Sequence, residues 1–438
     1  MKKVMFLLLG LALILPWTIR AHDDDHGDRD RDEHGRRGEE HHEHNVRTPV
    51  HLVGVIPVPG NPVTSADIAW TDPVTERYYF ADRSNFGVDI IDAEDDVFVG
   101  RVTGMAGPLP SGGGTATTNG PGPNGVLVTP KRELWAGDGN SMVRVADVDP
   151  NSLNYLNLIG AASTAIPDCD SATAHYCGRA DELGFDPRHR LILVANNAPL
   201  NVNAPHAPIA PYATFISAVP PFSVLGHVSF PNAGGLEQPL WDAEIGRFLL
   251  TVPGKIVNGL ITADPSVAVI NPTTEMVEKT FNLNCPTLAG NTSVSANGIA
   301  LGPFQHALVS ACGFPIILSA LTGHVFNVIR QVGGGDEVWH NPGDGRFYVT
   351  GLDMRTPPVP SPAVQSLGVI DAETSTWLQN IPDVRGKNPA AFAENNHVFT
   401  IVQINAAIVA APATDNSTCA QFGFKGTGCV AIFEHDEK

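Results

Sequence analysis

A repeated pattern of short strands constrains this chain more than any other feature. Residues 236–278 contain four short strands: one that opens near Glu237, an apolar one after Arg247, one that alternates into Asn271, and a polar last strand. Several short, evenly spaced strands separated by turn residues are typical of all-β repeat proteins. The segment therefore predicts one unit of a repeat, with further copies elsewhere in the chain.

Six more stretches carry the pattern. They open near Asp67, Pro123, Asp181, Ala296, Asp336 and Asn388. Seven units of roughly 40 to 60 residues, each with four strands, indicate a β-propeller. The last unit ends at residues 429–433 without a fourth strand, while residues 51–57 belong to no other unit. We therefore predict an all-β, seven-bladed β-propeller over residues 48–438, closed by this N-terminal strand, which removes the exposed sheet edges.

Residues 1–21 have the features of a signal peptide: Lys2 and Lys3, an apolar run over residues 4–15, and a cleavage site after Ala21. Ile19 is larger than the usual residue three positions before cleavage, so a retained anchor or another cleavage point are alternatives. The apolar run is short for a membrane span, and the sequence contains no other candidate. We expect a periplasmic or secreted protein.

Residues 22–47 differ from the rest of the chain. They carry six histidines among ten aspartates and glutamates, and no large apolar residue before Val46. Such a segment buries too little apolar surface to offset the entropy of ordering, which predicts disorder. Imidazoles among carboxylates could bind Zn²⁺, Cu²⁺ or Ni²⁺ loosely; a solvated polar leader is the equal alternative.

The six cysteines fit export, since disulfides persist in oxidising compartments. Proximity in the repeat map suggests three pairs: Cys169 with Cys177, Cys285 with Cys312, and Cys419 with Cys429. Six cysteines allow 15 pairings, so this connectivity is a hypothesis.

The formal net charge of −19 argues against a nucleic-acid partner, because phosphate binding needs a basic surface. Long irregular segments fall where a propeller's connections emerge on one face: residues 103–122, 160–179, 196–212, 253–265, 350–367 and 403–427. Binding usually lies on such loops. We expect a small-molecule or protein ligand on this loop face.

Two resemblances follow from the motifs. The Val-Ile-Asp-Ala-Glu-Thr pattern of residues 369–374, with its relatives at 88–92 and 269–274, resembles the YVTN-type bacterial propeller repeat. This resemblance covers most of the chain and implies the fold. The lead-in at Glu237 and the Asn-Gly openings at Asn124 and Asn297 are similar to short stretches of the gluconolactonase/senescence-marker propellers.

The second resemblance implies a divalent ion in the central channel of an enzyme that acts on lactones or phosphoesters. Carried over by motif, its ligands would be Glu237, Asn297, Asn124 and Asp181. That family usually has six blades, whereas seven are counted here.

The residues themselves also suggest a channel site, because every unit opens with an acid or its amide. Asp67, Asp336 and Asn388 join the four residues above. Seven oxygen-bearing side chains aimed at one axis would suit Ca²⁺, which takes about six to eight oxygens. The alternative is local turn chemistry, in which Asp and Asn bond their own backbone.

Candidates for a nucleophile or base are few. Gly-x-Ser-x-Gly is absent. His340 could act as a general base on the channel wall, and His175 and His206 lie in long loops. Trp241 is interpreted as core packing. Two hypotheses remain: a binding protein that uses the loop face, and a metal-dependent, lactonase-like hydrolase.

Overall fold

The computed structural model describes residues 48–108, 122–139, 141–166, 179–197, 210–355 and 364–435. The signal peptide, the histidine-rich leader, the Cys169–Cys177 pair, His175 and His206 all lie outside the described residues.

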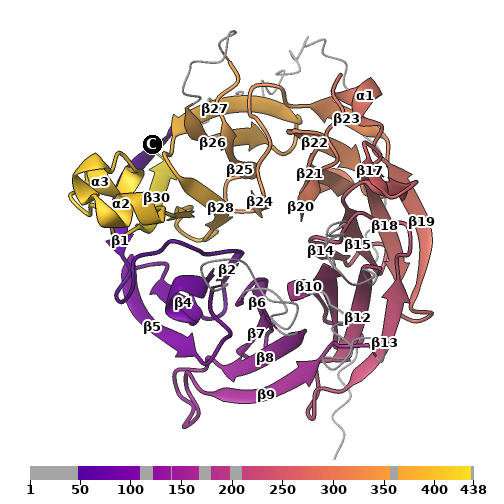
Figure 1. The fold of residues 1–438 in the computed structure, drawn as a ribbon, viewed down its shortest axis with the longest axis horizontal. Helices are drawn as coiled ribbons and strands as arrows, with labels where there is room; N and C mark the ends of the chain where they lie inside the picture. The colour runs from indigo at the N-terminus through magenta and orange to yellow at the C-terminus, as the bar shows by residue number, and fades with distance from the viewer. Residues whose placement is uncertain are drawn as a thin grey trace, which may run out of the picture. The chain divides into compact units, whose positions relative to one another are not determined.

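The described residues form seven four-stranded antiparallel sheets arranged as a ring (Figure 1). The first three blades, from inner to outer strand, are β2 (Ala69–Asp72), β3 (Arg77–Asp82), β4 (Gly87–Asp92) and β5 (Val97–Thr103); β6 (Val126–Val128), β7 (Glu133–Asp138), β8 (Met142–Asp147) and β9 (Leu158–Ser163); β10 (Arg179–Asp186), β11 (Leu191–Asn197), β12 (Tyr212–Ser217) and β13 (Val224–Ser229). The next three are β14 (Pro239–Asp242), β15 (Arg247–Val252), β18 (Ser266–Asn271) and β19 (Met276–Asn282); β20 (Ala296–Leu301), β21 (His306–Ala311), β22 (Phe314–Ser319) and β23 (Val325–Val328); β24 (Val338–Asn341), β25 (Arg346–Leu352), β26 (Gln365–Asp371) and β27 (Thr376–Pro382). The predicted seven-bladed propeller is confirmed.

The seventh blade joins the two ends of the described chain. It contains β28 (Gly386–Ala391), β29 (Val398–Val402), β30 (Cys429–His435) and, on its outer side, β1 (Val50–Pro57). The β1–β30 register runs from Val50 opposite His435 to Pro57 opposite Cys429. Outside this ladder, the Gln379 amide of the sixth blade accepts from the Val50 N–H and donates to the Val50 carbonyl. The predicted closure by the N-terminal strand is confirmed.

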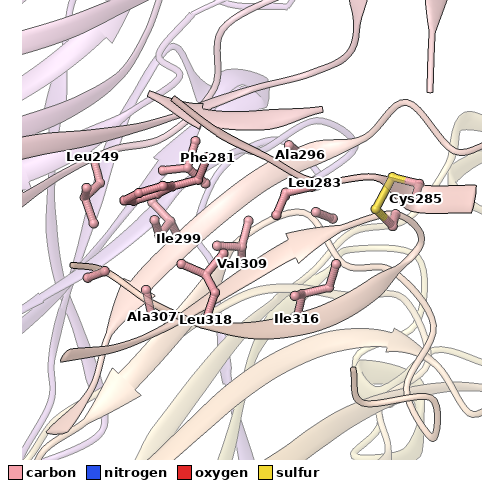
Figure 2. Close-up of a cluster of buried hydrophobic side chains, with 14 of the residues drawn as sticks. Leu249, Phe281, Leu283, Cys285, Ala296, Ile299, Ala307, Val309, Ile316 and Leu318 are labelled. Carbon is pink, nitrogen blue, oxygen red and sulfur yellow. A yellow bond between two sulfur atoms is a disulfide. The ribbon is translucent and has the colours of Figure 1, made fainter. Parts of the chain in front are cut away.

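The hydrophobic core lies between adjacent blades, because each sheet presents apolar side chains to both neighbours. Figure 2 shows one such layer, in which Leu249 and Phe281 of the fourth blade pack against Val309 and Leu318 of the fifth. The disulfide between Cys285 and Cys312 lies at the edge of this layer. This pairing and Cys419–Cys429 were both predicted and are confirmed.

The Asp-containing repeat motif has a local cause. The Asp371 carboxylate accepts hydrogen bonds from the backbone N–H groups of Glu373 and Thr374, at 3.0 and 2.9 Å. Asn271 caps the equivalent turn of the fourth blade in the same way, and Asp242 caps the turn between β14 and β15 of that blade. An Asp or Asn at this position therefore closes the turn between two strands.

Two segments that were predicted to be irregular contain secondary structure. Residues 253–265 form a hairpin of β16 (Lys255–Val257) and β17 (Leu260–Thr262) around Asn258 and Gly259. Both turn residues have positive φ, at 52° and 77°, as the commonest two-residue hairpin turn requires.

Residues 403–427 hold three short helices: α2 (Ala406–Ala410), η3 (Pro412–Thr414) and α3 (Thr418–Gln421). Asn405 and Ser417 cap α2 and α3. The other described helices are α1 (Cys285–Leu288), η1 (Arg83–Asn85) and η2 (Pro303–Gln305).

A chain that begins at residue 58 should lose most of its stability relative to one that begins at residue 48. Val50 and Ile56 are 1% and 3% exposed in the closed ring, and burial of each such side chain is worth about 1.5–3 kcal/mol. Their loss alone would remove about 3–6 kcal/mol from a typical 5–15 kcal/mol. Urea denaturation of both chains measures the difference; equal midpoints would show that β1 does not close the ring.

Candidate functional site

The seven inner strands surround the central channel and begin at the same end of it. Each inner strand contacts the next round the ring, including β28 with β2 (Figure 1). We call the end where these strands begin the mouth. The predicted site residues all lie there, within or just before the inner strands: Asp67, Asn124, Asp181, Glu237, Asn297, Asp336 and Asn388.

Arg83 connects the first two of these residues. It lies in η1, between the second and third strands of the first blade. Its guanidinium donates to the Asp67 carboxylate and to the Asn124 Oδ1, the latter at 2.6 Å through Nη2 and 3.1 Å through Nε. Burial, followed by the nearby charge of Arg179, lowers the pKa of Arg83 to about 10. Arg83 is not among the site residues predicted from the sequence.

A second group joins the third and fourth blades. The Arg179 guanidinium bonds the Asp181 carboxylate at 2.7 and 2.9 Å. The Asn197 amide donates to Glu237 Oε1 at 3.0 Å and to Asp181 Oδ2 at 3.4 Å. Burial raises the pKa of Glu237 well above its usual range; the charges of Asp181 and Asp336 add to the effect, and Arg179 opposes it.

The remaining mouth residues bond across blade boundaries. The Asn297 amide donates to the Asp336 carboxylate at 3.2 Å, and Asn388 Oδ1 accepts from the Glu337 backbone N–H at 3.3 Å. Asn388 Nδ2 is buried and has no hydrogen-bond partner among the described residues.

The two Asn-Gly dipeptides at the starts of inner strands form hydrogen bonds to the neighbouring blades. The Gly125 N–H donates to the Asp181 carbonyl at 3.0 Å, and the Gly298 N–H donates to the Asp336 carbonyl at 2.8 Å. A Cβ on Gly125 would lie 2.4 Å from that carbonyl oxygen, so a larger residue would push the blades apart. The Asn124 amide also donates to the next blade, at the Ala180 carbonyl, 2.8 Å away. These asparagines therefore bond the adjacent blade rather than their own turn.

Two further acids lie just below the mouth. Glu182 in β10 and Glu337, which precedes β24, are each 3% exposed. Burial raises the pKa of Glu182 well above its usual range, and repulsion from Glu337 is the next cause. Burial also raises the pKa of Glu337 to about 8, although the interaction with Glu182 lowers it. Neighbouring buried acids with raised pKa values favour a state in which at least one of them is protonated.

This pair contains unsatisfied atoms. Glu182 Oε2 and Glu337 Oε1 are buried without a hydrogen-bond partner in the described part of the chain. Neither residue is among those predicted from the sequence, although each directly follows a predicted site residue in the dipeptides Asp181-Glu182 and Asp336-Glu337. A repeated Asp-Glu at a strand start was the signal that could have identified them.

A polar cavity of about 490 Å³ opens beside the mouth between the fifth, sixth and seventh blades. Asn297, Asp336 and Lys387 supply an amide, a carboxylate and an ammonium group. Gly335 and Gly351 belong to the same wall, where backbone is exposed to a ligand. The cavity can therefore hold a polar molecule that contacts both side chains and backbone.

The mouth acids do not converge on one point. Among the described residues, no three His, Cys, Asp or Glu side chains form a group that could hold a metal ion. The acids bond Arg83, Arg179, Asn197 and Asn297 instead. The arrangement thus supplies the oxygen donors that Ca²⁺ prefers, but not in a preformed coordination sphere.

His340 lies away from the mouth. It is the third residue of β24, four residues after Asp336. Its ring packs on Phe347 with 5.2 Å between centroids, and burial lowers its pKa. The structure therefore brings the seven mouth residues together but does not bring His340 to them; its role as a base stays a prediction.

Comparison of the sequence with protein families found no matching family model, and comparison with curated proteins found no relative. In the parts of the chain that the structure describes, no helix is long and apolar enough to span a membrane.

Replacement of Glu337 by Gln should flatten the pH dependence of stability. In the native protein the pKa of Glu337 is about 8, against 4.5 unperturbed, so between these values the folded chain holds a proton that the unfolded chain has lost. Stability is therefore greatest below about pH 4.5 for this group and falls as the pH rises to about 8.

The wild type should lose several kcal/mol over this window, since each pH unit of pKa difference is worth about 1.4 kcal/mol. Urea denaturation at about pH 5, 6.5 and 8, in the presence of a chelator, measures the loss. Glu373 is an exposed acid in the turn between β26 and β27, so the variant Glu373→Gln is the control. A Glu337→Gln curve parallel to the wild type would contradict the assignment.

Proposed function

We propose that this protein is an exported binding protein whose ligand enters the channel mouth and presents a positive charge there. The observation that carries the proposal is the set of acids gathered round the channel axis. They are Asp67, Asp181, Glu182, Glu237, Asp336 and Glu337.

The charge balance supports a cationic ligand. Two guanidinium groups, those of Arg83 and Arg179, bond mouth acids, and exposed Lys387 lies in the adjoining cavity. Six carboxylates against three cations leave the site negative when all are ionised. Buried acids without enough counter-charge either hold protons or gain from a bound cation, and the raised pKa values of Glu182, Glu237 and Glu337 fit this state.

The position of the site supports binding from the loop face. Connections into the inner strands and between the second and third strands emerge at the mouth, and they include the β16–β17 hairpin and helices α2 and α3. Loops placed on a rigid scaffold are the usual location of binding residues. The two disulfides favour an oxidising compartment and hence export, either to the periplasm or out of the cell.

A channel Ca²⁺ ion is one form that the cation could take. Its binding would require mouth carboxylates such as Glu237 and Asp181 to turn from their present partners toward the ion. The lactonase-like hydrolase depends on that ion, and it would also need a base nearer the mouth than His340. We therefore favour binding over catalysis. The leader, residues 22–47, remains a proposed auxiliary site for Zn²⁺, Cu²⁺ or Ni²⁺.

Titration calorimetry of the mature chain with Ca²⁺, and separately with the linear diamine putrescine, tests the proposal. At least one cation should bind, and Glu237→Gln should weaken it about tenfold or more, since loss of one charged partner costs about 1.4 kcal/mol or more. Glu373→Gln should bind as the wild type does.

Failure of both cations to bind at millimolar concentration, or binding that Glu237→Gln leaves unchanged, would refute the cationic ligand. Ca²⁺ bound at one ion per chain would justify a lactone and phosphoester screen. The same titrations with Zn²⁺, Cu²⁺ and Ni²⁺, on chains with and without residues 22–47, distinguish metal binding at the leader from metal binding at the mouth.

A further inference from the structure

The half of the channel that lies below the mouth contains a second, apolar cavity of about 320 Å³. Its walls come from the inner strands of the first four blades, through Ile68, Val126, Val128, Leu183, Pro239 and Leu240. It also includes Pro130 and Pro187, which lie in the turns after β6 and β10. The cavity therefore extends toward the face opposite the mouth.

Two indole rings line this cavity. Trp70 is the second residue of β2 and Trp241 the third residue of β14, and both are only partly buried. The Trp241 ring is held edge-to-face against Phe248 at 5.0 Å, and the Trp70 ring against Trp339 at 5.4 Å. Trp241 thus packs on the core, as the sequence predicted, but also forms part of the cavity wall.

A buried acid also lines the cavity. Glu182 is 3% exposed, belongs to the cavity lining, and its Oε2 has no hydrogen-bond partner in the described residues. The acids that act on it are Glu337, Glu237 and Asp181. The described lining residues include no lysine or arginine to neutralise it.

We propose that this lower cavity binds a small organic cation, with its ammonium group at Glu182 and its apolar body against Trp70 and Trp241. Aromatic faces attract cations through their quadrupole, and a buried carboxylate gains from a counter-charge. The apolar walls offer too few oxygens for a metal ion, which takes six or more when it is Ca²⁺. The volume lies at the lower end of small-molecule sites, about 300 to 1,000 Å³.

Binding at this site is coupled to proton release. Burial raises the pKa values of both Glu182 and Glu337. A bound cation favours the ionised form of these acids, so its binding should release a proton from them. Affinity should therefore rise as the pH increases toward about 8. A quaternary ammonium probe isolates this effect, since its own charge does not change with pH.

Benzyltrimethylammonium, titrated into the mature chain by calorimetry and tryptophan fluorescence, is the test. It should bind more tightly at about pH 8 than at about pH 6, and at least tenfold more tightly than neutral benzyl alcohol. Glu182→Gln and Trp241→Leu should each weaken it about tenfold, whereas Glu373→Gln should not. Glu182→Gln mimics the protonated acid in shape, so it should fold, and circular dichroism checks this.

No binding at millimolar concentration, equal binding of benzyl alcohol, or binding unchanged in both variants would overturn the proposal. This proposal for the lower cavity does not depend on whether a ligand binds at the mouth. Trp241 lies outside the mouth. Titrations of the Trp241→Leu variant with Ca²⁺ or putrescine therefore test cation binding at the mouth separately.

Discussion

Pairing of β1 with β30 is the interaction on which the rest of the structure depends. A seven-bladed ring is closed only when the first and last strands share a sheet, and this ladder joins residues nearly 400 positions apart, as Val50 and His435 show. Closure fixes the seven inner strands round one axis. Without it, the mouth acids would belong to separate blade ends rather than to one site.

The channel mouth illustrates how a protein keeps many buried acids in one place. Arg83 and Arg179 each bond an acid from the start of an inner strand, and Asn197 holds Asp181 and Glu237 through one amide. Hydrogen bonds and paired charges offset part of the cost of removing these groups from water. The remaining cost is reflected in the raised pKa values of Glu182, Glu237 and Glu337.

The Glu182–Glu337 pair divides the channel by chemical character. Above it lie charged and amide groups, together with the polar cavity that includes Asp336 and Lys387. Below it, apolar strand residues and two tryptophans surround the smaller cavity. Two buried acids with raised pKa values therefore lie between two cavities of different chemical character.

The sequence alone predicted the blade count and two disulfides, because each depends on short-range patterns within one unit. It predicted the closing strand by elimination, since the last unit lacks a fourth strand and residues 51–57 belong to no other unit. Turn acids such as Asp371 and cysteines such as Cys419 and Cys429 have their partners within a few residues or one blade. It also located seven polar residues at the mouth, since every inner strand begins at the same end.

Only the tertiary structure decided what those residues do. Arg83 lies in the connection between the second and third strands of its blade, and its contact with Asn124 depends on how two blades approach each other. Glu182 and Glu337 come from the third and sixth blades, so no local pattern pairs them. The sequence specifies the blades through local turns and alternation, whereas the site arises from contacts between blades distant in the chain, which the closed ring alone brings together.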